Sequence, residues 1–347
     1  MTIRAFITGA AGVQLTTDER AFLRDADPWG LILFARNVES PDQVSRLVAG
    51  FREAVGRGDA PVLIDQEGGR VQRLGPPHWP SYPAGAAYGR LYHDDRSVGL
   101  AAARLGARLI AADLDALGIT VDCMPIADVL GPGADPVIGD RAFGTTTDQV
   151  SAIATAFAAG LADGGVLQVL KHIPGHGRAA ADSHHRLPVV TTDRGTLEAT
   201  DFAAFRFLAG LPLAMTAHVV FSAIDSTAPA TTSATMVREV IRGSIGFDGL
   251  LMSDDLAMNA LSGTMAQRAR AVIAAGCDMV LHCNGRLAEM QAIAAVVPSL
   301  SGRAAARASA ALASRRSPTD IDVAAARDEF ASLLMEHRVA GIGRHDG

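Results

Sequence analysis

Short runs of apolar residues recur along the chain, and most of them end at a polar residue. Eight such runs cover residues 5–8, 31–36, 62–65, 119–128, 166–172, 213–218, 250–254 and 279–284. Segments with helical spacing lie between most of them, at residues 41–55, 98–117, 148–162, 195–208, 235–245 and 265–275. Continuous apolar strands that alternate with helices are typical of a parallel sheet covered on both faces. Eight such units predict a single-domain α/β fold, the (β/α)8 or TIM-type barrel.

Residues with capping side chains precede several of the expected helices. Ser40 stands before the segment 41–55, Thr147 before 148–162, and Thr232 or Ser233 before 235–245. Their hydroxyl groups can accept hydrogen bonds from the first free backbone N–H groups of a helix. The first unit is the least regular, because residues 8–15 are compatible with either a hairpin turn or a strand-to-helix step.

The last part of the chain differs in composition from the rest. After about residue 298 it becomes rich in Ala and Arg, and it is amphipathic from residue 320 to 337. No Pro- or Ser-rich linker introduces a second globular unit. We therefore expect residues 1–300 to form the barrel and residues 301–347 to form terminal helices packed on the same domain.

The composition argues against several classes of protein. Hydrophobic residues make up 49% of the 347 and charged residues 20%, which favours a globular core over a disordered chain. The net charge of -6, without a stripe of Lys and Arg, argues against a nucleic-acid partner. No apolar run reaches the ~18 residues of a membrane span, and the first residues do not resemble a signal peptide. Three cysteines without paired spacing indicate free thiols in a reducing compartment, so we expect a cytoplasmic protein. We also expect a monomer and no cofactor.

The stretch from Lys171 to His184 carries the densest set of chemically useful side chains. It begins Lys-His-Ile-Pro-Gly-His-Gly directly after an apolar run, and Asp182-Ser183-His184 follows a Gly- and Ala-rich segment. Loops at strand ends often carry catalytic groups, and the glycines allow unusual backbone angles. Asp182 and His184 are close enough in sequence for the carboxylate to orient the imidazole ring. This loop is the first candidate for acid/base chemistry.

Polar residues at the ends of the other apolar runs form a second set. They are Asp65, Asp128, Lys171, His172, His218, Asp254 and His282. In a barrel of this kind, side chains at the C-terminal ends of the strands point into one pocket. Burying this many charged groups in a core would cost free energy, so we expect a shared cleft.

Two of these strand ends suggest specific roles. Asp65 is followed by a Gly68-Gly69 reversal and then by Arg70 and Arg73. A carboxylate can accept hydrogen bonds from two sugar hydroxyls, and a guanidinium group can donate a fixed pair of hydrogen bonds.

The adjacent pair Asp254-Asp255 ends another expected strand. Because neighbouring strand residues face opposite sides, we expect one carboxylate in the pocket and the other turned away. The inward one would suit a nucleophile or a partner for a developing positive charge.

Five motifs, taken in order, resemble those of the family 3 glycoside hydrolases. They are Asp-Gln-Glu-Gly-Gly-Arg-Val-Gln-Arg from Asp65, Lys-His-x-Pro-Gly-His-Gly from Lys171, Asp-Ser-His from Asp182, Met-Thr-Ala-His from Met215, and Ser-Asp-Asp-Leu-x-Met from Ser253. The resemblance runs from about residue 5 to about residue 297. Within that family, the motifs resemble more narrowly those of the bacterial β-N-acetylhexosaminidases that trim muropeptides during cell-wall recycling. One departure is Arg-Ala-Ala-Ala from Arg178, where relatives usually carry Asp-Thr.

The resemblance implies a retaining, exo-acting enzyme that removes terminal β-linked N-acetylglucosamine from peptidoglycan fragments through a covalent glycosyl-enzyme. Asp254 matches the nucleophile of the family, and His184 matches its general acid/base, with Asp182 as the partner that orients it. The residues that match its sugar-binding set are Asp65, Arg73, Arg141, Lys171 and His172. The resemblance implies no metal ion.

Three other interpretations remain open from the sequence. A metal-dependent hydrolase is one, with ligands drawn from His172, His176, His184, His218, Asp254 and His282. Lys171 would then place a positive charge beside the metal. A phosphorylase is the second, because an imidazole acid/base repels an anionic acceptor less than a carboxylate does. A sugar-binding protein that has lost catalysis is the third, and it would be expected to lack His184 or Asp254.

Overall fold

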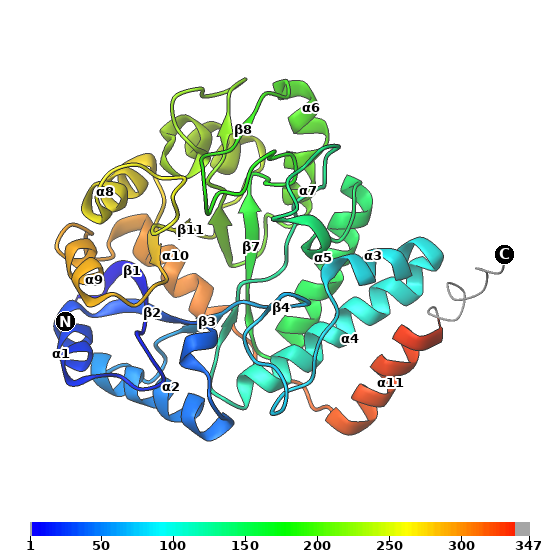
Figure 1. Ribbon diagram of the computed structural model, residues 1–347, viewed down its shortest axis with the longest axis horizontal. Helices are drawn as coiled ribbons and strands as arrows, with labels where there is room; N and C mark the ends of the chain where they lie inside the picture. The colour runs from blue at the N-terminus through cyan, green and yellow to red at the C-terminus, as the bar shows by residue number, and fades with distance from the viewer. Residues whose placement is uncertain (1, 337–347) are drawn as a thin grey trace.

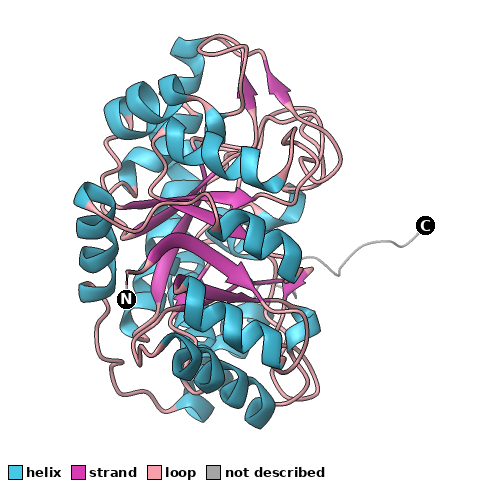
Figure 2. Cartoon of the chain, turned by 90° about the vertical axis from the view of Figure 1, so that its left-hand side faces the viewer, coloured by secondary structure: helices cyan, strands magenta, loops and turns pink. Residues whose placement is uncertain are grey.

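Eight parallel strands close into a barrel in the computed structural model, which describes residues 2–336. They are β1 (Arg4–Gly9), β2 (Pro28–Leu33), β3 (Val62–Ile64), β6 (Val121–Asp122), β7 (Leu167–Ile173), β9 (Leu213–Thr216), β11 (Leu250–Asp255) and β12 (Met279–His282). Each strand pairs with the next along the chain, and β12 pairs with β1. Figure 2 shows these strands inside a shell of helices. The predicted (β/α)8 barrel is confirmed.

Helices follow the strands around the barrel (Figure 1). They are α1 (Thr17–Ala26), α2 (Pro41–Val55), α3 (Gly85–Asp94), α4 (Arg96–Asp115), α5 (Thr147–Asp163), α6 (Arg194–Ala199), α7 (Asp201–Phe207), the π-helix η4 (Met236–Ser244), α8 (Met265–Ala275), α9 (Leu287–Ala294), α10 (Gly302–Ala313) and α11 (Val323–Glu336). Ser40 caps α2 as predicted, and the Ser233 hydroxyl accepts a hydrogen bond from the Met236 N–H. The cap of α5 is Thr146 and not Thr147, one residue earlier than expected.

Three segments differ from the expected pattern. The predicted helix at 195–208 is two helices, because Thr200 leaves the helical conformation between α6 and α7. The apolar run 119–128 has regular strand pairing only over Val121–Asp122, and a single further bridge joins Ile126 to Lys171. Helix α3 follows a small hairpin, β4 (Gln66–Gly68) and β5 (Val71–Gln72), that the apolar pattern did not indicate.

The first unit is a strand-to-helix step and not a hairpin. Strand β1 pairs in parallel with both β12 and β2, and α1 follows it. Its irregularity lies elsewhere, in a register shift between Arg4 and Ile7 where β1 meets β2.

Alternate residues of the strands fill two separate apolar cores. Ala5 and Ile7 belong to the core inside the barrel, whereas Phe6 between them packs in the outer core below the helices. This follows from the two-residue repeat of a strand, whose successive side chains point to opposite faces. The inner core also includes Ala308 and Ala311, so α10 contributes to it.

The last described helix packs on the outside of the barrel. Helix α11 lies along α4, and the Phe330 ring is 6.4 Å from the rings of both Tyr82 and Tyr88. Residues 337–347, the end of the expected terminal segment, lie outside the described residues. No helix within residues 2–336 is both long and apolar enough to cross a bilayer.

Candidate active site

A cavity of about 640 Å³ opens at the C-terminal ends of the barrel strands. All eight predicted site residues line it: Asp65, Arg73, Arg141, Lys171, His172, Asp182, His184 and Asp254. They come from strands β7 and β11 and from four connecting segments that are far apart in the sequence. The barrel therefore brings together the groups that the motifs indicated separately.

The hairpin after β3 places the first two of these groups. Gly68 and Gly69 both have positive φ angles, of 93° and 58°, which most side chains avoid. A Cβ atom on Gly68 would lie 2.3 Å from the Pro83 carbonyl oxygen, so glycine is also required for space. Gln66 ties the hairpin together by accepting hydrogen bonds from the backbone of Arg73. Arg73 can then donate to Asp65, with Nη2 at 3.1 Å from Oδ2.

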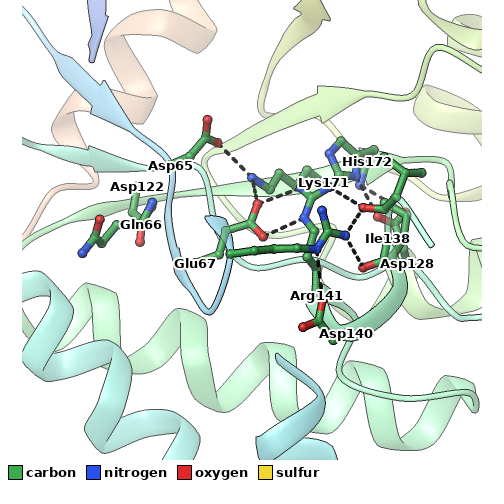
Figure 3. A network of polar contacts seen from close by, with 12 residues as sticks. Asp65, Gln66, Glu67, Asp122, Asp128, Ile138, Asp140, Arg141, Lys171 and His172 are labelled. Carbon is green, nitrogen blue, oxygen red and sulfur yellow. Dashed lines mark hydrogen bonds and ion pairs between the residues drawn. The ribbon is translucent and has the colours of Figure 1, made fainter. Parts of the chain in front are cut away.

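A buried network of charges forms the floor of the cavity (Figure 3). Lys171 donates to Asp65 Oδ1 at 3.0 Å and lies 2.5 Å from Glu67 Oε1. Arg141 binds the same Glu67 carboxylate through two hydrogen bonds, of 2.9 and 2.8 Å. Burial opposes charge on both carboxylates, yet Lys171 and the neighbouring guanidinium groups lower the pKa of Asp65 and bring that of Glu67 to about 2. Burial likewise opposes charge on Lys171, but the two carboxylates raise its pKa above the usual value. All of these groups are charged at neutral pH.

His172 is oriented by a carboxylate behind it. Its Nδ1 donates to Asp128 Oδ2 at 2.7 Å, which leaves Nε2 as the free nitrogen of a ring that lines the cavity. Asp128 is fully buried and also accepts from the backbone N–H of His176 at 2.7 Å. Burial would raise the pKa of Asp128, but the two histidines hold it below its usual value.

Two adjacent carboxylates, Asp254 and Asp255, both line the cavity, contrary to the expectation that one would turn away. The pairing of β11 with β12 shifts register between Met252 and Asp255. An extra residue in a strand interrupts the alternation of side chains, so two neighbouring side chains can face the same side. A similar shift lies between Lys171 and Ile173 in β7, where Lys171 and His172 both face the cavity.

The surroundings of these two carboxylates differ. Burial raises the pKa of Asp254, but His218 and His172 outweigh it and the pKa is lowered. Burial raises the pKa of Asp255, whose Oδ1 accepts from the backbone N–H groups of Ala257 and Cys283. Asp254 is thus the carboxylate that stays ionised most readily, and Asp255 shapes the backbone around it.

The loop between β7 and the short strand β8 (Val189–Val190) carries the imidazole candidate. His184 Nδ1 donates to Asp182 Oδ1 at 2.7 Å, and the backbone N–H of His184 reaches the same oxygen at 2.8 Å. Burial raises the pKa of Asp182, but these hydrogen bonds lower it overall. The His184 side chain remains 59% exposed, with Nε2 free to exchange protons.

Three of the expected strand-end groups, Asp128, His218 and His282, do not line the cavity. His218 Nε2 donates to the Asp255 carbonyl at 3.0 Å, so its Nδ1 faces the Thr231 hydroxyl as an acceptor. His282 pairs instead with Glu289, outside the lining of the cavity. Within residues 2–336, no three His, Cys, Asp or Glu side chains are grouped so as to hold a metal ion.

Sequence reasoning assigned no role to Glu67 or Ser183, and it considered His176 only as a ligand in a metal-dependent hydrolase. Glu67 stands two residues after Asp65, and this spacing could have indicated that both face the same side. His176 and Ser183 line the cavity close to the imidazole candidate. Both residues belong to motifs that the sequence analysis identified, but their contacts depend on the path of the loop between β7 and β8.

Comparison with known proteins agrees with this geometry. The family model described as the glycosyl hydrolase family 3 N terminal domain matches residues 7–313. The chain belongs to glycoside hydrolase family 3. Within the family, a beta-hexosaminidase of Alkalilimnicola ehrlichii is 41% identical over 82% of each chain, and one of Methylococcus capsulatus is 39% identical over 93% of this chain and 95% of the relative.

A solved structure has the same fold over almost the whole chain. NagZ from Neisseria gonorrhoeae, crystallised with N-trifluoroacetyl-D-glucosamine, superposes with a TM-score of 0.86 at 32% identity, covering 96% of this chain and 99% of that one. A family 3 β-N-acetylglucosaminidase from Paenibacillus superposes with a TM-score of 0.79 at 31% identity, over 95% of this chain and 66% of that one. The protein is thus a glycoside hydrolase of the β-hexosaminidase type.

Proposed function

We propose that this family 3 enzyme is an exo-acting β-N-acetylglucosaminidase that hydrolyses its substrate with retention of configuration. The observation that carries the proposal is that an ionised carboxylate, an imidazole and a charged sugar-binding floor line the same cavity. Asp254 is the nucleophile, His184 is the general acid/base, and Asp182 orients His184.

In the first step, Asp254 attacks the anomeric carbon of the terminal sugar. The bond from that carbon to the leaving oxygen breaks, and this oxygen takes a proton from His184 Nε2. The lowered pKa of Asp254 supports this role, because the nucleophile must be ionised while a positive charge develops on the sugar.

In the second step, His184 accepts a proton from water as the water attacks the glycosyl-enzyme. The bond to Asp254 breaks, and the sugar leaves with its original configuration. The hydrogen bond of 2.7 Å between Asp182 and His184 Nδ1 supports this role, because it orients the ring and leaves Nε2 to take up and release the proton.

The charged floor binds the terminal N-acetylglucosamine. Residues Asp65, Arg73, Arg141, Lys171 and His172 offer acceptors and donors whose directions are set by their own contacts. We assign the acetamido preference to this floor on the strength of the relative bound to N-trifluoroacetyl-D-glucosamine.

We further propose peptidoglycan fragments as substrates, namely N-acetylglucosamine linked to anhydromuramic acid with or without peptide. The likeness to NagZ over 96% of the chain supports this substrate class. The three cysteines are all buried and unpaired, which supports a reducing, cytoplasmic setting. We propose that the enzyme acts there as a monomer.

A phosphorylase is the second candidate. His184 replaces the anionic acid/base that most glycosidases use, so an anionic acceptor such as phosphate would be repelled less. In that reaction, phosphate in place of water would attack the glycosyl-enzyme and release a sugar phosphate.

Hydrolysis of 4-nitrophenyl N-acetyl-β-glucosaminide tests these alternatives against the matching glucoside, with and without phosphate. Rapid cleavage of the acetamido substrate alone, independent of phosphate, supports the hydrolase. A rate that rises with phosphate, together with a sugar phosphate product, supports the phosphorylase. Binding without turnover of either substrate would overturn both and leave a sugar-binding protein.

A further inference from the structure

Ser183 is the buried member of the Asp182-Ser183-His184 segment. It is 2% exposed, whereas the side chains of Asp182 and His184 are 27% and 59% exposed. The segment therefore points its reactive groups outward while its central residue is inserted into the protein. A polar side chain is buried at a cost unless it is hydrogen-bonded, so the contacts of Ser183 are informative.

Ser183 forms contacts with two segments of the active site, one that follows β7 and one that follows β11. Its hydroxyl lies 3.2 Å from His176 Nε2, in the turn that ends β7. Its carbonyl oxygen accepts a hydrogen bond of 3.2 Å from the backbone N–H of Ala260, in the loop that follows β11 and Asp254. One residue thus joins the loop of the imidazole to the strand end of the proposed nucleophile.

The partner of the hydroxyl is itself held in place. The backbone N–H of His176 donates to Asp128, the same carboxylate that orients His172. Burial lowers the pKa of His176 to about 4, so its ring is neutral at physiological pH. A neutral ring offers Ser183 a fixed hydrogen-bond partner without placing another cation beside His184.

We propose that Ser183 is a positioning residue that holds His184 in its catalytic place. The inference rests on the proposed acid/base role of His184. Because Ser183 directly precedes His184 in the chain, displacing Ser183 displaces the imidazole as well. Single hydrogen bonds to His176 and Ala260 are weak enough to be exchanged with water, so the segment can dock and release as substrate enters and product leaves.

The test compares leaving groups in the full-length enzyme. A phenyl N-acetyl-β-glucosaminide needs a proton on its leaving oxygen, whereas the 2,4-dinitrophenyl analogue hardly does. Ser183→Ala should lower kcat/KM for the phenyl substrate by about five- to tenfold, which corresponds to the loss of one hydrogen bond. The kcat/KM for the dinitrophenyl substrate should change by less than about twofold, because sugar binding and Asp254 are untouched.

Two further variants make the outcome decisive. Ser151→Ala is the matched control, since Ser151 is also buried (6% exposed) and its hydroxyl donates only to a carbonyl within α5. It should leave both substrates unaffected. His184→Ala is the benchmark, and its loss should be confined to the phenyl substrate. If His184→Ala shows no such selectivity, the proposed function fails; if it does but Ser183→Ala does not, the positioning role fails.

A second measurement follows the loop directly. Arg186 is exposed just after the segment, so trypsin can cut there when the loop is released. Ser183→Ala should be cleaved after Arg186 several-fold faster than the wild type, and Ser151→Ala at the wild-type rate. Equal cleavage in all three proteins would overturn the positioning role.

Discussion

The two sides of the cavity are built differently. The sugar-binding floor joins Asp65, Glu67, Arg141 and Lys171 through short contacts between almost fully buried groups. The segment that carries His184 is exposed, and two single hydrogen bonds of Ser183 join it to His176 and to Ala260.

This difference separates recognition from proton transfer. A preorganised floor needs little rearrangement when sugar binds, so its charges are already in place when the transition state forms. A loop with few anchors can open for exchange and close over the substrate. Substitutions on the two sides should therefore produce different kinetic signatures.

The largest effect is expected at the proposed nucleophile. Asp254→Ala should lower kcat by more than about 10⁴-fold, because it removes the carboxylate on which the proposed covalent intermediate forms. Asp255→Asn is the comparison variant: it removes the neighbouring charge while keeping much of the shape, and its loss should be far smaller. Product analysis by NMR should show retention in the wild type. A more severe loss in Asp255→Asn than in Asp254→Ala would reverse the assignment.

The next largest effect is expected at His184, on the loop side of the cavity. His184→Ala should lower kcat/KM for the phenyl substrate by about 10²- to 10³-fold, in the range typical of a lost general acid. Sugar affinity, measured as the inhibition constant of N-acetylglucosamine, should stay close to that of the wild type. Weakened sugar binding in this variant would mean that the loop also contributes to recognition.

A smaller effect is expected from the floor. Glu67→Gln removes the carboxylate shared by Lys171 and Arg141 and leaves two buried cations with one fewer partner. The free energy of unfolding should fall by about 3 kcal/mol, and KM should rise while the leaving-group dependence stays unchanged. Urea denaturation and steady-state kinetics measure these changes. Selective loss with poor leaving groups would contradict the division between the two sides.

The smallest effect is the pH dependence of the difference in unfolding free energy between the wild type and Glu67→Gln. The pKa of Glu67 is about 2 in the folded protein against an ordinary value of 4.5, so folding favours its ionised form. Its stabilisation is complete above the unfolded pKa and is lost as the pH falls toward 2. The difference in unfolding free energy between wild type and Glu67→Gln should therefore shrink between about pH 4.5 and pH 2. A difference that stays constant over this range would argue against an ionised Glu67.

Much of the barrel could be predicted from the sequence, because each strand is a continuous apolar run that ends in a polar residue. The same regularity placed Asp65, Lys171 and Asp254 at one end of the barrel. The motif from Asp182 to His184 indicated the imidazole partner. These features depend on local sequence and on one general property of parallel barrels.

The features that escaped prediction depend on long-range contacts. Alternation predicted that Asp255 would face away, but the shift of β11 against β12 depends on its partner strand. The role of Glu67 requires Lys171 and Arg141, which reach it only in the closed barrel. The break at Thr200 is likewise invisible to apolar spacing, since residues on both sides of it are buried.

The shared carboxylate of Glu67 has a consequence for folding. It connects the segment around Arg141, 74 residues later in the chain, and the still more distant strand β7 to the β4–β5 hairpin, so the sugar-binding floor exists only once the barrel has closed. A ligand that binds this floor binds the native state alone and must raise the stability of the whole barrel by an amount that grows with the logarithm of its concentration above the dissociation constant. Occupancy by a terminal sugar would then act as a measure of complete folding.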